Sequence, residues 1–344
     1  RHGRLPITDV AAPAVAVARE GVTLQPFQAY VIELLWPILT HSEEATAWYG
    51  SEGRPRRAGD RVRNPDLADF IEAVARDRGA GFYDGPEADA IEADMVAGDG
   101  LLTAADLAAY EVVERRPLAA AFRDRTVLIN PQPAFGGELV ALGLALTAEL
   151  PPDAPRVDRV ARLVELERAR QANQVGERLR QQRGTTHVSV ADAEGNAAAM
   201  TTSNGEGSGY VAPGTGVMLN NMLGEDDLHP EGFHGAPPGE RVSSMMSPLI
   251  VLRDGEVEAV LGSGGSKRIR TAMMQVISNV VDFDMPVREA VESPRVHWDG
   301  ARVQIEPGYG EDTLRALAER WPVNRWSVLD IYFGGVHAIA PDGE

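Results

Sequence analysis

The sequence predicts an α+β fold in which helices and antiparallel strands form stacked layers in the order α, β, β, α. Apolar residues keep helical spacing through the first part of the chain, whereas paired strand runs with tight turns begin after residue 184. Helical spacing then returns between and after these strands. With 344 residues, 44% of them hydrophobic, the chain is long enough to bury a core in one or two domains.

The first elements are predicted to be helices. Residues 10–20 are small and apolar, and Asn64 precedes a stretch whose apolar side chains recur every three or four positions. Thr103 and Asp106 form a capping-box pattern for a short helix over residues 104–110. These patterns indicate packing rather than a site.

An α/β unit follows. Residues 127–129 form a buried-strand run, and a proline-rich turn separates them from a helix over residues 138–149. After a linker at 151–155, residues 157–183 are predicted to form a charged helix. We expect a boundary where that helix ends.

Antiparallel strands dominate the next part. Residues 188–191 and 197–202 surround a turn, and residues 248–252 and 257–261 surround another that contains Asp-Gly, which favours a primed hairpin turn. The later predicted elements are a glycine loop at 262–266, helices at 269–280, 286–291 and around Leu314 and Leu317, and a strand at 336–340.

Composition excludes several classes of function. A net charge of -18 repels nucleic acid, and the longest apolar stretches, such as 139–146, are too short to cross a bilayer. The absence of cysteine excludes disulfides and thiolate sites, and the seven histidines are scattered. We therefore expect no metal and no organic cofactor. No signal peptide pattern is present, so the sequence leaves localisation open.

Candidate chemistry lies in polar and glycine-rich segments at strand ends. Residues 184–187, 201–209 and 241–248 are rich in hydroxyls, although each alone is also typical of an ordinary turn or strand start. Residues 262–265 lack the motifs of a P-loop or a dinucleotide fold. Their backbone N–H groups suit either a tight turn or an oxyanion hole.

These segments occur in a fixed order within about eighty residues, which makes the combination specific. They are Thr185-Thr186-His187-Val188-Ser189-Val190 with Asp192 and Gly195-Asn196, Thr201-Thr202-Ser203, Pro213-Gly214-Thr215-Gly216-Val217-Met218-Leu219-Asn220-Asn221, Ser243-Ser244-Met245 with Ser247-Pro248, and Gly262-Ser263-Gly264-Gly265. Together with upstream runs at 101–110 and 131–137, they resemble the gamma-glutamyltranspeptidase family.

The resemblance implies an N-terminal-nucleophile hydrolase with a four-layer αββα sandwich. It also implies a precursor that cuts itself between Gly184 and Thr185. Residues 1–184 would then be a large-subunit portion, helical and incomplete at its N-terminus, and residues 185–344 the small subunit. The two chains would form one intertwined domain.

The resemblance assigns roles to individual residues. Thr185 would form a γ-glutamyl ester that water or an amino-acid acceptor resolves, and Ser203 would hold its hydroxyl. Gly264 and Gly265 would form the oxyanion hole. Ser243 and Ser244 would bind the α-carboxylate of the donor. The family's upstream carboxylate-binding arginine has no counterpart in this sequence.

The ammonium site matches the family less closely. Asn204 is the best match for the family's asparagine, with Glu206 as a substitute, and either Glu225 or Asp227 would be the acidic ligand. Met222 stands where the family has a polar residue.

Elementary chemistry agrees with a self-activating threonine. A threonine hydroxyl needs a base, and cleavage frees an α-amine with an ordinary pKa of about 8 next to that hydroxyl. Glycine at 184 leaves the scissile carbonyl open to attack. Two alternatives remain: a glutaryl-type β-lactam acylase of the same fold, and an unprocessed, non-catalytic relative that acts as a binding protein.

Overall fold

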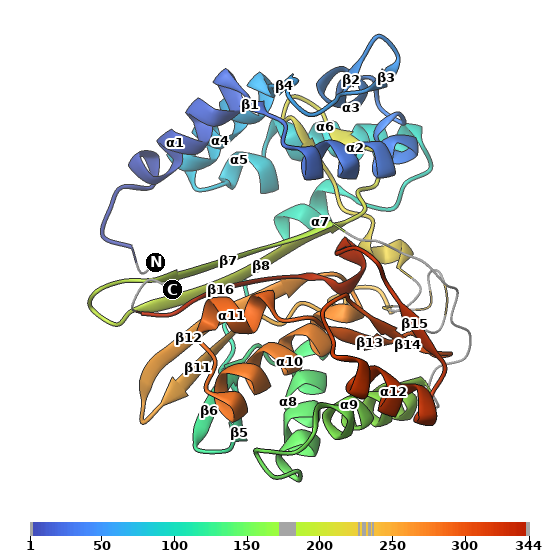
Figure 1. Ribbon diagram of the computed structural model, residues 1–344. Helices are drawn as coiled ribbons and strands as arrows, with labels where there is room; N and C mark the ends of the chain where they lie inside the picture. Colours follow the sequence, from blue (N-terminus) through green and yellow to red (C-terminus); the bar gives the residue numbers. More distant parts are fainter. Residues whose placement is uncertain are drawn as a thin grey trace. The chain divides into compact units, whose positions relative to one another are not determined.

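The computed structural model describes residues 3–171, 184–225, 228, 232, 235 and 237–341 (Figure 1). The chain divides into two units, Arg1–Val113 with Glu206–Asn221 and Glu114–Gly205 with Met222–Glu344. Each unit is described below by itself. Within the described ranges, no helix is both long enough and apolar enough to span a bilayer.

The first unit is mainly helical, as predicted. Its helices are α1 (Ile7–Glu20), α2 (Pro26–Leu39), α3 (Glu43–Tyr49), α4 (Pro65–Asp77), α5 (Ala80–Tyr83), α6 (Pro86–Ala97) and α7 (Ala104–Ala108). Its strands are the antiparallel pairs β1 (Val22–Thr23) with β4 (Arg61–Val62), β2 (Gly50–Ser51) with β3 (Arg54–Pro55), and β9 (Val211–Ala212) with β10 (Val217–Met218).

N-cap hydrogen bonds begin two of these helices at the residues that the sequence predicts. The Asn64 side chain accepts a hydrogen bond from the N–H of Leu67 at the start of α4. Thr103 and Asp106 form the predicted capping box of α7, each accepting from the other's backbone N–H. The short helix there is therefore confirmed, although it ends at Ala108.

The second unit contains a five-stranded antiparallel sheet in the order β16-β12-β11-β6-β5. The strands are β5 (Leu118–Phe122), β6 (Arg125–Ile129), β11 (Leu249–Arg253), β12 (Glu256–Gly264) and β16 (Gly335–Ile339). A separate hairpin, β7 (Gly184–Ala191) and β8 (Ala197–Gly205), packs over β12 and β16 (Figure 1).

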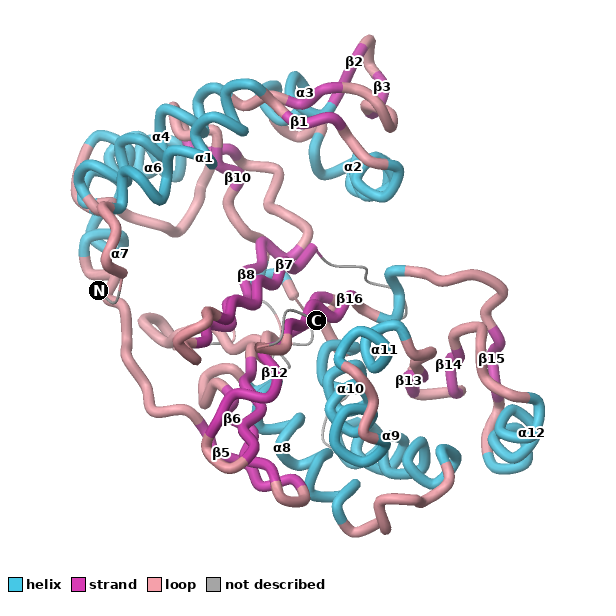
Figure 2. Tube along the Cα trace, turned by 60° about the vertical axis from the view of Figure 1, so that its left-hand side comes forward, coloured by secondary structure: helices cyan, strands magenta, loops and turns pink. Residues whose placement is uncertain are grey.

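Helices cover the other face of this sheet. They are α8 (Phe135–Ala148), α9 (Arg156–Gln171), α10 (Arg268–Phe283), α11 (Val287–Glu292) and α12 (Glu311–Arg320), beside a small sheet of β13 (Val296–Trp298), β14 (Val303–Ile305) and β15 (Val323–Arg325). Figure 2 shows the sheet between the hairpin and α8 and α10. The second unit thus contains three layers in the order α, β, β. Short 3-10 turns, η1 (Met222–Gly224) and η2 (Ile331–Phe333), complete it.

The main core lies between the sheet and these helices. It joins strand side chains such as Val127 and Leu249 to the apolar stripe of α10. The residues predicted for that stripe, Ile269, Ala272, Met273, Val276, Ile277 and Val280, are all buried. The core therefore follows the helical periodicity of the sequence.

Some predicted boundaries were wrong. The glycine run predicted as a loop from residue 262 continues β12 as far as Gly264, since Gly262 and Gly264 pair with His337 and Gly335 of β16. Helix α9 is described only to Gln171, so the predicted helix over 172–183 and the boundary at its end lie outside the described residues.

A buried ion pair joins Glu167 of α9 to Arg270 of α10. Arg270 donates through Nε to Glu167 Oε1 at 2.5 Å and through Nη2 to Glu167 Oε2. Both side chains are 1% exposed, and Arg270 Nη1 also lies 3.8 Å from the sulfur of Met245. Removing one member of such a pair leaves the other charge buried without compensation.

Replacing Arg270 with Met is therefore expected to lower the free energy of unfolding by about 3–5 kcal/mol. The double variant Glu167→Leu/Arg270→Met should recover most of this loss, because no unpaired charge remains. Arg162→Met, which removes a half-buried arginine of α9 paired with the exposed Glu149 and Glu165, is the control, with an expected change below about 1 kcal/mol. Urea denaturation measures all three, and an Arg270→Met protein as stable as the control would contradict the expectation.

Candidate active site

The β7–β8 hairpin places Thr185 directly opposite Ser203. The two residues are partners in the strand register, and Thr185 Oγ1 lies 3.1 Å from Ser203 Oγ. Ser203 Oγ also accepts a hydrogen bond from the N–H of Gly205 at 3.1 Å, which orients the serine hydroxyl. The ladder is irregular between Gly184 and Thr185, which is the bond predicted to be cut.

The hairpin forms because its turn is hydrogen-bonded at both ends. Asp192 Oδ1 accepts from the backbone N–H groups of Glu194 and Asn196, both at 2.9 Å. Gly195 has a φ of +83°, a conformation that glycine adopts without strain. The predicted hairpin is confirmed, and this turn fixes the register of Thr185 with Ser203.

Alternation along β7 turns Thr185 and His187 toward β12. Two glycines of β12 at the same spacing, Gly262 and Gly264, face them. A Cβ at Gly264 would lie 2.6 Å from the carbonyl oxygen of Thr185, and one at Gly262 would lie 2.2 Å from the His187 ring. Only glycine therefore allows β12 to approach β7 so closely.

His187 is the buried residue in this contact between β7 and β12. It is 4% exposed, and its Nδ1 and Nε2 lie 2.8 Å from Thr201 Oγ1 and 2.9 Å from Ser189 Oγ. Burial, helped by the nearby His337, lowers the pKa of His187 to about 4 from its ordinary 6.5. The imidazole is thus neutral at pH 7 and links β7 to β8 through the Thr201 hydroxyl.

This lowered pKa predicts a pH-dependent stability. Below pH 6.5 the unfolded chain binds a proton at His187 that the folded protein excludes until about pH 4, so stability is lost as the pH falls through that window. His187→Gln should flatten the decline measured by urea denaturation between pH 7 and 4.5. The exposed His41 supplies the control, since His41→Gln should leave the slope of the wild type unchanged.

The segment after Gly264 turns sharply into α10. Gly265 has a φ of +118°, and a Cβ there would lie 2.7 Å from Cα of Gly334, which itself has a φ of +80°. Among the described residues, the N–H of Gly265 donates no hydrogen bond. This segment can therefore present a backbone donor beside the Thr185 backbone.

Ser243 and Ser244 lie on a loop whose backbone is hydrogen-bonded to the segment at the start of α8. Ser244 accepts from the N–H of Gly136 at 3.1 Å and donates its own N–H to Pro133 at 3.4 Å. Ser244 is 9% exposed and Ser243 is half-buried. No hydrogen bond within the described ranges joins either serine side chain to Thr185.

The predicted ammonium ligands are divided between the two units. In the first unit, Glu206 accepts from Asn221 Nδ2 and donates its N–H to Asn221 Oδ1, both at 2.9 Å. In the second unit, Glu225 is 6% exposed, and Asn204 lies exposed on the face of β8 opposite to Ser203. Asp227 lies outside the described residues.

Sequence reasoning missed the roles of His187, Gly262 and Asn221. The first two could have been found from spacing, because Thr185 and His187 repeat with the same interval of two as Gly262 and Gly264. Asn221 carries no such signal. In the parts of the chain that the structure describes, no group of three or more His, Asp or Glu side chains could hold a metal ion.

Comparison with known proteins identifies relatives over the whole chain. The model of a family described as gamma-glutamyltranspeptidase matches residues 1–174 and 153–344. A glutathione hydrolase proenzyme of Escherichia coli (strain K12) is 29% identical over 407 residues, covering 100% of this chain and 70% of that protein. An Acylase ACY 1 proenzyme of Pseudomonas sp. (strain V22) is 30% identical over 389 residues, covering 100% of this chain and 69% of its own.

A solved structure has the same fold. The crystal structure of a cephalosporin acylase from Bacillus halodurans superposes with a TM-score of 0.82 at 26% identity, covering 98% of this chain and 71% of that one. The predicted N-terminal-nucleophile-hydrolase fold, of class α+β, is thereby confirmed. The family match and these relatives show that the chain belongs to the gamma-glutamyltranspeptidase family.

Proposed function

We propose that this protein is an enzyme that hydrolyses or transfers γ-glutamyl groups of glutathione-like amides through an ester on Thr185. The observation that carries the proposal is the 3.1 Å contact of Thr185 Oγ1 with Ser203 Oγ, at a strand start where Gly264 packs on the Thr185 backbone. Family membership supports it, as does the glutathione hydrolase name of the relative from Escherichia coli.

Activation would begin with self-cleavage. Thr185 Oγ1 attacks the carbonyl carbon of Gly184, the bond to the Thr185 nitrogen breaks, and the acyl group moves from nitrogen to oxygen. Water then hydrolyses this ester and leaves a Gly184 carboxylate and a free Thr185 amine. The proposed products are residues 1–184 as the large-subunit portion and residues 185–344 as the small subunit.

The same hydroxyl would then act on the donor. The freed amine takes the proton of Thr185 Oγ1, which attacks the γ-carbonyl carbon and produces a tetrahedral oxyanion. The N–H groups of Gly264 and Gly265 would stabilise that charge, and one such donor is commonly worth about 3 kcal/mol. The amine leaves with the proton, and water or an acceptor amino acid opens the ester.

Different residues would bind the two charged groups of the donor, its α-carboxylate and its α-ammonium. Ser243 and Ser244 would hold the α-carboxylate with hydroxyl and backbone donors. Either Glu225 or Asp227 would receive the α-ammonium, whereas Asn204 lies on the face of β8 opposite to Ser203 and so points away from the nucleophile. A glutaryl group has the same carboxylate but lacks the ammonium, so the acidic ligand distinguishes this proposal from the acylase alternative, which the Acylase ACY 1 relative favours.

Paired substrates test the proposal. We expect kcat/KM for a γ-glutamyl anilide to exceed that for the glutaryl anilide by about 10- to 100-fold, the usual effect of one charged hydrogen bond. Glu225→Gln or Asp227→Asn, whichever removes the acidic ligand, should reduce only the γ-glutamyl reaction. Ser243→Ala and Ser244→Ala should reduce both reactions. Faster turnover of the glutaryl anilide would favour an acylase, and no turnover of either would favour a binding protein.

A further inference from the structure

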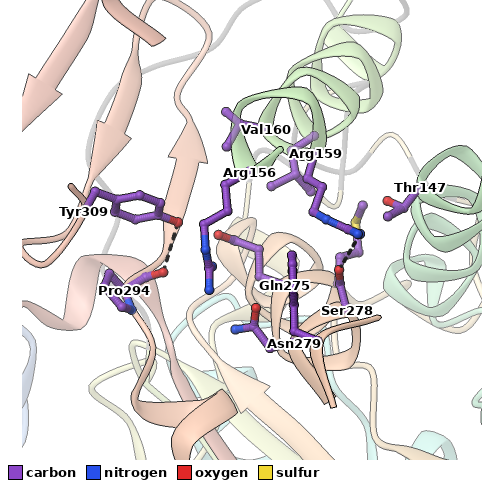
Figure 3. Close-up of a pocket in the computed structure, with 12 residues that line it drawn as sticks. Thr147, Arg156, Arg159, Val160, Gln275, Ser278, Asn279, Pro294 and Tyr309 are labelled. Carbon is purple, nitrogen blue, oxygen red and sulfur yellow. Dashed lines mark hydrogen bonds between the residues drawn. The ribbon is translucent and has the colours of Figure 1, made fainter. Parts of the chain in front are cut away.

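A small cavity in the second unit lies between the start of α9, the middle of α10 and the segment that carries Tyr309 (Figure 3). Its volume is about 30 Å³. Because a water molecule needs roughly 10–15 Å³ of such space, the cavity has room for a small ion and not for an organic substrate. None of its lining residues belongs to the proposed active site.

Two arginines, Arg156 and Arg159, line the cavity, and positive charge exceeds negative charge around it. Asp282, whose side chain is fully buried, accepts from Arg123 Nε at 2.7 Å and from Arg159 Nη1 at 2.5 Å. Arg156 also lines the cavity, and its charge adds to those of the two arginines that share Asp282. Arg295, next to the lining residue Pro294, is already paired with Glu306. One carboxylate is thus shared by two guanidinium groups, and a third guanidinium group lines the same cavity.

Two of these guanidinium groups lie against the same ring. The Cζ atoms of Arg156 and Arg159 are 5.1 and 4.6 Å from the centre of the Phe283 ring. Figure 3 shows Arg156 extending from α9 into the space between Tyr309 and Gln275. Two positive charges on one ring at the edge of the same cavity repel each other, and an anion in the cavity would reduce that repulsion.

One strong donor in the wall is unused. Arg159 is 8% exposed, and its Nε is buried with no hydrogen-bond partner among the described residues. Its Nη1 and Nη2 are satisfied by Asp282, Ser278 and the carbonyl of Pro152. A buried N–H of a charged group without an acceptor is costly, which is the second indication of an anionic ligand.

The neutral groups of the wall do not supply the missing negative charge. Gln275 is bonded to the backbone of Thr271 and Val296, and Asn279 donates to the carbonyl of Ala290. Tyr309 donates to the carbonyl of Pro294 at 3.0 Å, and burial raises its pKa to about 12, so its hydroxyl stays protonated at pH 7. An anion from solution would supply that charge.

We propose that this cavity binds a small inorganic anion of halide size, held by the Arg156 guanidinium and Arg159 Nε. Chloride matches the volume and the donor set. The site is independent of the proposed activity, since it would stabilise the junction of α9 with α10 whether or not Thr185 is a nucleophile.

Thermal unfolding of the whole protein tests the site. Sodium chloride is titrated against sodium gluconate at constant ionic strength, because gluconate is too large for the cavity. We expect Tm to rise and saturate, by about 2–4 °C in total. Arg156→Gln should abolish the rise, whereas Arg162→Gln, which removes an arginine of α9 that does not line the cavity, should retain it. Equal responses of the two variants, or a rise without saturation, would mean general salt effects and overturn the proposal.

A direct measurement covers the case in which Arg156→Gln fails to fold. Crystals of the wild type soaked in sodium bromide should show an anomalous peak between Arg156 and Arg159, and the conservative Arg156→Lys variant should bind with reduced occupancy. A peak in the crystal without any chloride response of Tm would be binding at crystal concentration only and would count against the site. Absence of the peak would also overturn it.

Discussion

Thr185→Ala protein is expected to remain one uncleaved chain and to lose γ-glutamyl hydrolysis by a factor of about 10⁴ or more. The loss of the hydroxyl removes both the attack on Gly184 and the ester-forming step, and deleting the nucleophile of an acyl-transfer enzyme typically costs this much or more. Intact-mass spectrometry and turnover of a γ-glutamyl anilide measure the two effects. The smaller wild-type fragment should begin at Thr185.

The neighbouring threonine provides a matched control. Thr186 carries the same side chain on the opposite, exposed face of β7, paired with Thr202. Thr186→Ala should therefore cleave itself and turn over the anilide within a few-fold of the wild type. Thr185→Ser should retain slow cleavage, because it keeps a hydroxyl. A Thr185→Ala protein that still splits at this bond would exclude Thr185 as the nucleophile.

Gly264→Ala is expected to lower kcat by about 10²- to 10³-fold and to slow self-cleavage. The added Cβ would lie 2.6 Å from the carbonyl oxygen of Thr185, so β12 must move away from β7 and take the oxyanion donors with it. One lost donor of this kind costs about 10²–10³ in kcat. Stopped-assay kinetics and the time course of cleavage measure the effect, and KM should change much less than kcat.

Gly335 is the control for this substitution. It is the register partner of Gly264 on β16, and a Cβ there would meet nothing within 4 Å. Gly335→Ala should therefore leave both cleavage and kcat near their wild-type values. If the two alanine variants behaved alike, general strain in the sheet, rather than the contact between Gly264 and Thr185, would explain the loss.

Local patterns predicted the elements well where the determinants are neighbours in sequence. The capping box at Thr103 and the turn at Asp192 depend on side chains that bond their own backbone a few residues away, so they are visible in the sequence. The apolar stripe of α10 is also visible in the sequence, because its residues recur at helical spacing within one segment. Helix α2 was not predicted individually.

The site could be predicted as a set of residues but not as a geometry. The resemblance named Thr185, Ser203 and Gly264, whereas their distances depend on how the hairpin stacks on β12, which no local pattern encodes. The same stacking extended β12 through Gly264 and buried His187. Hydrogen bonds between distant segments, such as the pair of Glu206 with Asn221, were invisible for the same reason.

The pairing of β6 with β11 in the sheet makes folding depend on whether the chain has been cut. Strand β6 pairs with β11 from Arg125↔Arg253 to Ile129↔Leu249, and the proposed cut after Gly184 would assign these two strands to different chains. The precursor can form this ladder as a first-order event within one chain, whereas denatured mature enzyme must bring two chains together, at a rate that depends on concentration. The intact precursor is therefore expected to fold faster than the denatured, cleaved enzyme refolds. The persistence of the mature enzyme would then rest on a slow rate of unfolding rather than on repeated refolding.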